Sequence, residues 1–442
     1  MSSSLALPAR GGRMAALVVG LCWLVVLFDG LDMFIYGSVL PHMMETKALG
    51  IDPGKAGDVG SYATFGMLIG ALSSGTVSDW VGRKKTIIVS TAVFSLASAV
   101  CASASSLGMF SFGRFLAGLG LGGLLPSAIT MVTEYAPRGR RALIVGSLMT
   151  AHQAGGIVAG FVALWTGDWR VSFWICVIPL FIGVPLAIKF LPESMAFLQA
   201  KGRTADAQAL ADRYGVELAA RDKERPAATE RFSALTALFR GGQWVQTLLF
   251  WLASFGGLLL VYGVSQWLPS LMKANGYDLG SSIGFVIVIN LGGIVGMLIG
   301  GRLTDKFGGS RISAIWFGAT AIGIYSLSIK MALPLTYTVV FLTGMFLFSA
   351  QAMIYATVAH RSDDDNRATA VGWTSGMGRF GAVFGPWLGG QLLATGSTTA
   401  GFTAFAIAGV FAMVMVSLTG LRRVHSAEPQ STTQQQELTP TG

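Results

Sequence analysis

Residues 66–85 read GMLIGALSSGTVSDWVGRKK, and residues 292–311 read GGIVGMLIGGRLTDKFGGSR. Both stretches place glycines and one aspartate at the same positions. The first set is Gly66, Gly70, Gly75, Asp79 and Gly82, and the second is Gly292, Gly296, Gly301, Asp305 and Gly308. Every pair is separated by 226 positions. A pattern repeated at one constant offset predicts a chain built from two related halves.

A second pair of stretches shows the same offset. Arg141-Ala142 and Gly155 match Arg367-Ala368 and Gly381, 226 positions later. Agreement of two independent stretches makes a chance match implausible, so the offset serves as an alignment of the halves. It pairs Gln153 with Arg379, and it pairs Asp29 and Asp32 with the apolar Phe255 and Leu258.

The composition indicates that most of the chain lies in lipid. Apolar residues make up 52% of the sequence and charged residues 12%, whereas soluble domains carry about 25% charged residues. The net charge of +9 does not indicate a nucleic-acid-binding face, because the cations lie between apolar runs. All three cysteines lie inside apolar runs, so we expect no disulfide, metal or cofactor.

Twelve apolar runs are long enough to span a bilayer, which requires about 20 residues. The first run is too long for a cleaved signal peptide. The runs lie at 14–40, 57–78, 86–105, 108–135, 141–165, 171–191, 244–270, 279–301, 312–330, 334–358, 369–394 and 400–421. These positions predict an all-α membrane protein with two six-helix halves.

The polar segments divide the chain. We expect an N-terminal bundle at 1–191, a polar linker with one or two short amphipathic helices at 192–243, and a C-terminal bundle at 244–421. The Gln-, Thr- and Ser-rich residues 422–442 are expected to form a disordered tail.

The distribution of lysine and arginine predicts the orientation. One side has few cations: Lys47, Lys55, Arg170, Lys273 and Lys330. The other side has Arg83, Lys84, Lys85, Arg138, Arg140, Arg141, the whole linker, Arg302, Lys306, Arg311, Arg361, Arg367, Arg422 and Arg423. Both termini and the linker are therefore expected in the cytoplasm, with the spans in a bacterial inner membrane.

Gly75 to Lys85 resembles the signature of the major facilitator superfamily between its second and third helices, with Trp80 where a basic residue is usual. The stretch from Gly301 to Gly308 is a degraded copy, and Pro192-Glu193-Ser194 is also similar to the family pattern. The resemblance covers the whole chain. It implies a pseudo-two-fold fold of twelve helices that works by alternating access.

Other motifs resemble the aromatic acid:H⁺ symporters of that superfamily. They are the pair Asp29 and Asp32, the run from Arg114 to Gly123, and the stretch from Arg367 to Pro386. This resemblance implies import of benzoate, a hydroxybenzoate or gentisate with a proton. The run from Arg361 to Asn366, before the eleventh span, is more acidic than the pattern. Because it is expected in a cytoplasmic loop, this departure puts regulation or gating in doubt rather than the substrate class.

Asp29 and Asp32 are candidates for proton coupling. An aspartate at the centre of a span costs about 2.5–3.5 kcal/mol, and residues at i and i+3 share one helix face. With a rise of about 1.5 Å per residue, Asp32 and Arg114 lie at nearly the same depth. The alternative interpretation is a purely structural ion pair, or an aspartate near a helix end.

Arg379, near the middle of its span, is our first candidate for the substrate carboxylate, since a guanidinium can bind a carboxylate through two hydrogen bonds. The alternative is an arginine bonded to backbone carbonyls or to an acid of its own half. Gln153 and His152 are candidates for the ring substituents, although a lone histidine is more often a packed core residue. Further candidates for stacking or hydrogen bonding, each more often a packing residue, are Tyr36, Tyr262, Trp267, Tyr355, Trp373, Asn290, Gln266 and Gln351.

The repeated motif is a candidate gate. By family resemblance, Asp79 caps a neighbouring helix and pairs with arginine while the protein faces outward. The gating candidates are Gly75, Asp79, Gly82, Arg83, Lys84 and Asp305. The alternative, cations that only fix topology, explains Arg83 to Lys85 but not Asp79 or the glycines.

Other functions remain open at this point. The sequence is compatible with a transporter of another organic anion, a drug/H⁺ antiporter or a substrate sensor. An enzyme or channel is disfavoured, because the spans carry no nucleophile–base motif, histidine cluster or phosphate-binding loop. We expect a monomer, while the particular acid and the proton stoichiometry are left undetermined.

Overall fold

The computed structural model describes residues 9–136, 141–214, 244–362 and 366–421, together with Leu218, Leu238 and Phe239. The described chain is helical throughout. In the first half the helices are α1 (Ala9–Glu45), the 3-10 turn η1 (Ala48–Gly50), α2 (Pro53–Val81), α3 (Arg83–Ala102), α4 (Leu107–Tyr135), α5 (Arg141–Thr166), α6 (Trp169–Ile175), α7 (Ile178–Phe181) and α8 (Gly183–Phe190). The linker contains α9 (Met195–Ala200) and α10 (Thr204–Tyr214).

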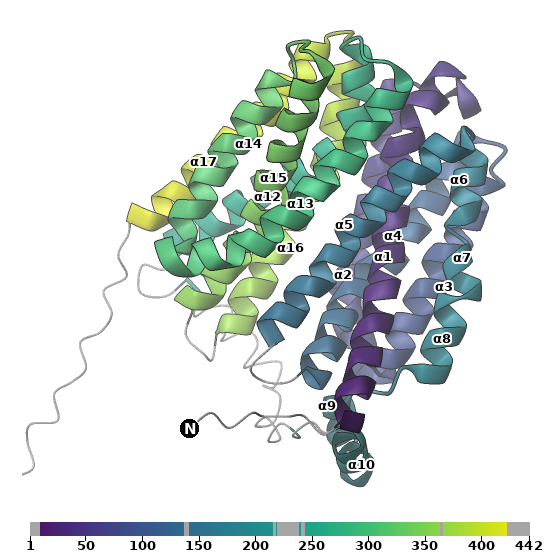
Figure 1. Ribbon diagram of the computed structural model, residues 1–442, viewed down its shortest axis with the longest axis vertical. Helices are drawn as coiled ribbons and strands as arrows, with labels where there is room; N and C mark the ends of the chain where they lie inside the picture. Colours follow the sequence, from purple (N-terminus) through teal and green to yellow (C-terminus); the bar gives the residue numbers. More distant parts are fainter. Residues whose placement is uncertain are drawn as a thin grey trace, which may run out of the picture.

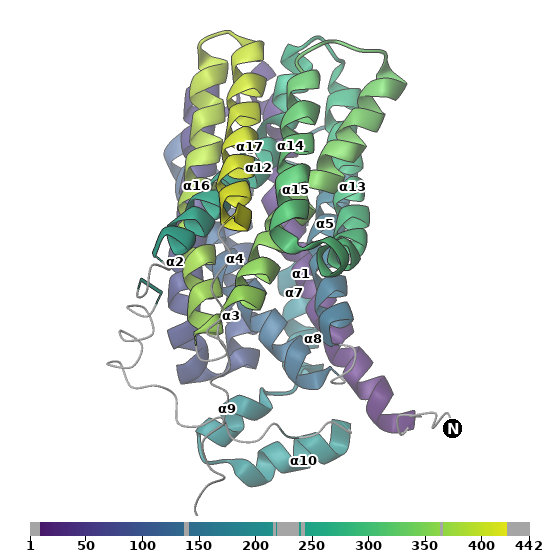
Figure 2. The same cartoon turned by 90° about the vertical axis from the view of Figure 1, so that its left-hand side faces the viewer.

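The second half contains α12 (Trp244–Ala274), α13 (Leu279–Phe307), α14 (Gly309–Ser326), α15 (Leu333–Arg361), α16 (Arg367–Ala394) and α17 (Thr398–Leu421). Figure 1 shows α1–α8 beside α12–α17, and Figure 2 shows α9 and α10 below the bundle. We call this end, where α1 also begins, the linker end, and the opposite end the far end. The tail at 422–442 lies outside the described residues.

Each predicted span coincides with one helix, except the sixth, which is divided into α6, α7 and α8. Pro179 and Pro185 lie in this divided segment, and proline cannot continue the backbone ladder of a helix. Within the described residues, nine helical segments are long and apolar enough to cross a membrane. The other three predicted spans correspond to α2, α14 and α16, which are not among these nine.

Glycines set the packing inside each half. A Cβ atom at Gly66 would overlap the carbonyl oxygen of Phe115, and one at Gly118 would overlap that of Ala63. The second half repeats both contacts 226 positions later, at Gly292 with Phe341 and at Gly344 with Ile289. Helices α2 and α4, and likewise α13 and α15, therefore pack backbone against backbone.

The first helix of each half departs from this offset. Gly155 packs on Leu27 and Leu31, whereas its counterpart Gly381 packs on Phe255 and Leu259, which lie 228 positions after them. The predicted pairing of Asp29 and Asp32 with Phe255 and Leu258 was therefore wrong by two residues, and their counterparts are Gly257 and Leu260. The cause is the longer loop between α1 and α2, which contains the turn η1.

The two halves meet toward the far end. Ser61 donates to the carbonyl of Val383 at 2.8 Å, Glu45 pairs with Lys273, and Gly57 packs on Gly390. Helices α5 and α13 touch where Gly156 meets Asn290 and where Gly160 meets Ile287.

Helices α2, α5, α13 and α16 are loosely packed around the glycines that lie nearer the linker end. A Cβ atom at Gly75, Gly146, Gly301 or Gly372 would have no described neighbour within 4 Å. The contacts described between the halves therefore lie toward the far end, whereas these glycines nearer the linker end have open space beside them.

Replacing Gly118 with alanine should force α2 and α4 apart and lower the free energy of unfolding by about 1–3 kcal/mol, as overpacking does. Thermal unfolding of the purified protein in detergent measures this change. The matched control is Gly146→Ala, which has open space and gains up to about 1 kcal/mol of helix propensity. Equal unfolding temperatures for the two variants would contradict the backbone contact.

Candidate functional site

Asp32 is enclosed within the first half. Its Oδ2 lies 3.1 Å from Nη1 of Arg114 on α4, and its Oδ1 accepts a 2.5 Å hydrogen bond from the hydroxyl of Ser98 on α3. The residue has no exposed surface. This contact agrees with the depths expected from the sequence, while its part in proton coupling stays a prediction.

Aromatic rings complete the surroundings of Arg114. The guanidinium carbon lies 5.4 Å from the ring centroid of Tyr36 and 5.7 Å from that of Phe173. A buried charge is costly unless it is paired, and the cation–π contacts add to the pairing with Asp32. Asp32 and Arg114 thus form one neutral unit that ties α1 to α4.

Asp29, one helical turn earlier, has different neighbours. Its Oδ2 lies 3.9 Å from Nε2 of His152 on α5, which is too long for a hydrogen bond. Its Oδ1 has no hydrogen-bond partner among the described residues, although Asp29 is only 2% exposed. The two aspartates therefore do not share one environment, and Asp29 is the one without a close cation.

Backbone packing places His152 beside Asp29. A Cβ atom at Gly30 would overlap the carbonyl oxygen of His152, and one at Gly155 would overlap that of Leu27. Helices α1 and α5 can approach this closely because both positions are glycine. The imidazole Nδ1 of His152 has no partner among the described residues.

Arg379 faces these groups from the second half. Its Nη1 donates to the hydroxyl of Tyr262 on α12 at 3.1 Å, and Asp29, His152 and Tyr355 lie within electrostatic range of its guanidinium. Among the described residues no carboxylate forms an ion pair with Arg379. We call Asp29, His152, Tyr262, Tyr355 and Arg379 the central cluster; it joins α1 and α5 to α12, α15 and α16.

Two phenylalanines that the sequence did not single out lie next to this cluster. The ring of Phe34 on α1 packs in a T-shaped arrangement against the imidazole of His152, with 5.6 Å between the centroids. It packs in the same way against the ring of Phe348 on α15, with 6.4 Å between the centroids. Phe34 therefore contacts both halves. The chain contains 27 phenylalanines, so no sequence signal distinguishes these two.

Three predicted amides are buried with an unpartnered oxygen. Gln153 Oε1, Asn290 Oδ1 and Gln351 Oε1 have no hydrogen-bond partner among the described residues. Asn290 packs against Gly156 between the halves, whereas Gln351 bonds Ser254 inside the second half at 3.1 Å. Buried amide oxygens normally find a donor, so Gln153 and Asn290 are suited to accept one from a bound molecule.

Four other candidates lie outside the cluster. Tyr36 donates to the carbonyl of Ala56 at 2.9 Å, and Gln266 donates to the same carbonyl at 3.5 Å. Trp267 is fully buried and donates to the carbonyl of Pro386 at 2.7 Å. Trp373 is 42% exposed and stacks on Trp251.

The candidate gate lies at the linker end of the first half. Asp79 pairs with Arg83 at 3.1 Å, and Gly82 adopts a φ of 98° between α2 and α3. The carboxylate of Glu193 packs on Gly82 and accepts from the backbone N–H groups of Lys84 and Ser194, at 3.0 and 2.9 Å.

Further hydrogen bonds connect this gate to the linker. Tyr135 donates to the carbonyl of Glu193 at 2.7 Å, and Ser194 donates to Glu134 at 2.7 Å. The sequence indicated Glu193 only through its motif, and it gave no signal for Glu134 or Tyr135. The side chains of Arg141 and Asp305, and the acidic residues 363–365, lie outside the described residues.

Within the described part of the chain, no group of three or more histidine, cysteine, aspartate or glutamate side chains is placed to hold a metal ion. The buried cysteines Cys22, Cys101 and Cys176 are free thiols.

Comparison with known proteins identifies relatives over the whole length. A family model described as Major Facilitator Superfamily matches residues 22–360 and, in a second match, 281–441. The chain is 34% identical to a benzoate transport protein of Acinetobacter baylyi, over 94% of this chain and 91% of the relative. It is 34% identical to a gentisate transporter of Corynebacterium glutamicum, over 88% and 83%, and 32% identical to a 4-hydroxybenzoate transporter of Pseudomonas aeruginosa, over 91% and 92%.

A solved structure shares the fold. The xylose transporter XylE of E. coli, in an inward open conformation, is similar with a TM-score of 0.72 and 16% identity, over 93% of this chain and 98% of the other.

Replacing Arg114 with glutamine should leave the Asp32 carboxylate buried without its cation, and should lower the free energy of unfolding by about 3–5 kcal/mol. In the double variant Asp32→Asn/Arg114→Gln neither side chain carries a charge, so more than half of the lost free energy of unfolding should be recovered. Thermal unfolding of the single and double variants in detergent measures the coupling. Losses that simply add would show that Asp32 and Arg114 do not act as a pair.

Proposed function

We propose that this chain, which belongs to the Major Facilitator Superfamily, imports a small aromatic carboxylate together with a proton. The chain is a multi-pass membrane transporter and not an enzyme, and it is related to aromatic acid transporters. The proposed substrate class is that of its relatives, which carry benzoate, gentisate and 4-hydroxybenzoate.

Arg379 carries the proposal. Its guanidinium lies between the halves and donates to Tyr262, with no described carboxylate as partner. A planar fork of N–H donors binds a carboxylate through two parallel hydrogen bonds. A substrate carboxylate at this position would neutralise a cation that the protein itself leaves without an acid.

The surroundings of Arg379 suit an aromatic ring. Phe34 and Phe348 contact each other between the halves, and such rings pack against a substrate ring edge-on or offset. Gln153 and Asn290 offer buried amide oxygens without partners, which can accept hydrogen bonds from ring hydroxyls. We assign the carboxylate to Arg379 and the ring substituents to the first-half side of the cluster.

Asp29 is the proposed proton carrier. Its carboxyl group has no close cation, whereas Asp32 is held by Arg114 and Ser98. Moving one negative charge against a potential on the order of 100 mV costs about 2.3 kcal/mol, and a proton that travels with the acid cancels this cost. Protonation of Asp29 would then be transmitted to the Asp32–Arg114 pair through α1, which carries both aspartates.

The proposed cycle is alternating access by two bundles, residues 1–191 and 244–421, joined by the linker 192–243. The far-end contacts between the halves support a closed outer side, and the cation-rich linker end is assigned to the cytoplasm. The gate of Gly75, Asp79, Gly82, Arg83 and Lys84 would then act at the cytoplasmic mouth, with Asp305 as its second-half counterpart. We propose a monomer with both termini in the cytoplasm.

Uptake of labelled benzoate, hydroxybenzoates and gentisate into proteoliposomes under an imposed pH gradient tests the function. Wild-type protein should accumulate at least one of them, and Asp29→Asn should bind it but lose accumulation driven by the gradient. The matched control is Asp278→Asn at the exposed N-cap of α13, since asparagine caps helices as well as aspartate. Uptake by Asp29→Asn that still follows the gradient would remove Asp29 from coupling, and transport of organic cations alone would favour the drug antiporter.

Replacing Arg379 with alanine should weaken binding of the acid by about 10- to 100-fold, the loss expected for hydrogen bonds to a charged group. The neutral amide of the same acid should lose little affinity, and Arg379→Lys should restore only part of the loss because lysine lacks the planar fork. Competition binding by the purified variants measures both ligands. Equal losses for acid and amide would show that Arg379 does not bind the carboxylate.

A further inference from the structure

A cavity of about 750 Å³ lies at the linker end of the second half, away from the central cluster. It opens between α13, α14, α15 and α17. Its lining includes the turn between α13 and α14, the end of α15 and the last turns of α17. The proposed transport cycle makes no use of this cavity.

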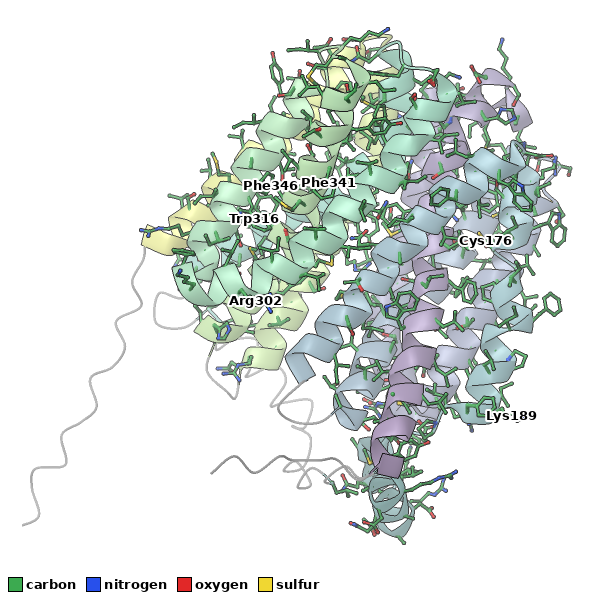
Figure 3. All side chains as sticks on the ribbon, in the orientation of Figure 1. Cys176, Lys189, Arg302, Trp316, Phe341 and Phe346 are labelled. Atoms are coloured by element: carbon green, nitrogen blue, oxygen red, sulfur yellow. The ribbon has the colours of Figure 1, made fainter. Side chains whose placement is uncertain are left out.

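The described lining is basic. Arg311, His360 and Arg361 line the cavity, and no acidic residue is among its described lining residues. Arg361 is fixed in place because its Nη1 donates to the carbonyl of Thr419 at 2.6 Å. Figure 3 shows Arg302, another exposed cation on α13, toward the same end.

The first turn of α14 directs backbone donors into this region. Helix α14 begins at Gly309, and no side chain caps its N-terminus. The N–H groups of residues 309–311 have no described acceptor, since the first bond of the helix runs from Ile312 to Gly308. Uncapped N–H groups at a helix start favour a negative charge.

An independent observation comes from Thr304. This residue lines the cavity and is only 8% exposed, and its hydroxyl has no described hydrogen-bond partner. A buried hydroxyl without a partner is uncommon, and here it is available to an oxygen-rich group in the cavity.

The first half shows what the equivalent turn binds. There Gly82 has a φ of 98°, close to the 87° of its counterpart Gly308. The carboxylate of Glu193 packs on Gly82 and accepts from the N–H of Lys84, whose counterpart is Ser310. In the second half the counterpart of Glu193 is the uncharged Thr419, and a Cβ atom at Gly308 would have no described neighbour within 4 Å.

We propose that this cavity binds the phosphate group of an anionic phospholipid. The backbone turn keeps the donors that hold a carboxylate in the first half, and three cationic or titratable side chains surround it. The cavity far exceeds the space of a single phosphate ion. Phe307 and Ile315, which line it, are 49% and 57% exposed, and such apolar surface at the end of spanning helices suits acyl chains.

The test is native mass spectrometry of the purified protein with phosphatidylglycerol and, separately, phosphatidylcholine. Wild-type protein should retain one phosphatidylglycerol more tightly than phosphatidylcholine. Arg311→Gln should weaken that binding by about five-fold, the effect of one cation near a lipid surface, and Arg361→Gln should do the same. The matched control is Lys85→Gln. Lys85 is the counterpart of Arg311 in the first half, where Glu193 already occupies the turn, so this variant should bind phosphatidylglycerol as tightly as the wild type does.

A second measurement distinguishes the phosphate of a lipid from free inorganic phosphate. Inorganic phosphate added at millimolar concentration should not displace the lipid, because it lacks the apolar contacts with Phe307 and Ile315. Equal effects of Arg311→Gln and Lys85→Gln, or no headgroup preference in the wild type, would overturn the site. Binding of inorganic phosphate that depends on Arg311, without retained lipid, would overturn the lipid assignment. Thermal unfolding of the exposed Arg311 variant checks that the fold is intact.

Discussion

Backbone contact at glycine is the constraint on which this structure depends. In lipid there is no hydrophobic drive to bring one apolar helix to another, so close packing must provide the attraction. Gly66 and Gly118 join α2 to α4, and Gly292 and Gly344 join α13 to α15 in the same register. Gly30 and Gly155 bring α1 and α5 so close that Asp29 and His152 become neighbours. The polar groups of the cluster are therefore placed by residues that have no side chain.

The buried charges fall into two kinds. Asp32 and Arg114 satisfy each other inside the first half, with Ser98 and aromatic rings around them. Asp29 and Arg379 lie between the halves and have no such close partner among the described residues. A charge held by its own half stabilises the bundle, whereas a charge left between the halves is available to a substrate or a proton. This difference supports the separate roles proposed for the two aspartates.

The repeat also shows how the halves diverged. The turn at Gly82 and the turn at Gly308 keep the same backbone conformation. In the first half Glu193 covers the turn and ties it to the linker, and in the second half the turn faces a basic cavity. Likewise Gln153 on α5 corresponds to Arg379 on α16. Equivalent positions thus carry different side chains and different contacts in the two halves.

The sequence by itself determined the helices, the duplication and the candidate charges, because apolar run length, a constant offset and the cost of an intramembrane aspartate are local properties of the chain. It also indicated Arg114 as the partner of Asp32, since depth along a helix follows from residue count. It placed the register of α1 against its counterpart wrongly, because the connection from α1 to α2, which contains the turn η1, is longer than the connection from α12 to α13. Only the tertiary structure decided that Asp29 lies near His152 and Arg379, while Asp32 contacts Arg114 and Ser98 inside the first half. It also decided that Phe34 and Phe348 contact each other. Trp267 and Tyr36 hydrogen-bond backbone carbonyls instead and serve the packing. The reason is rotational: which side of a helix meets which neighbour depends on crossings between helices far apart in sequence, and no local pattern records them.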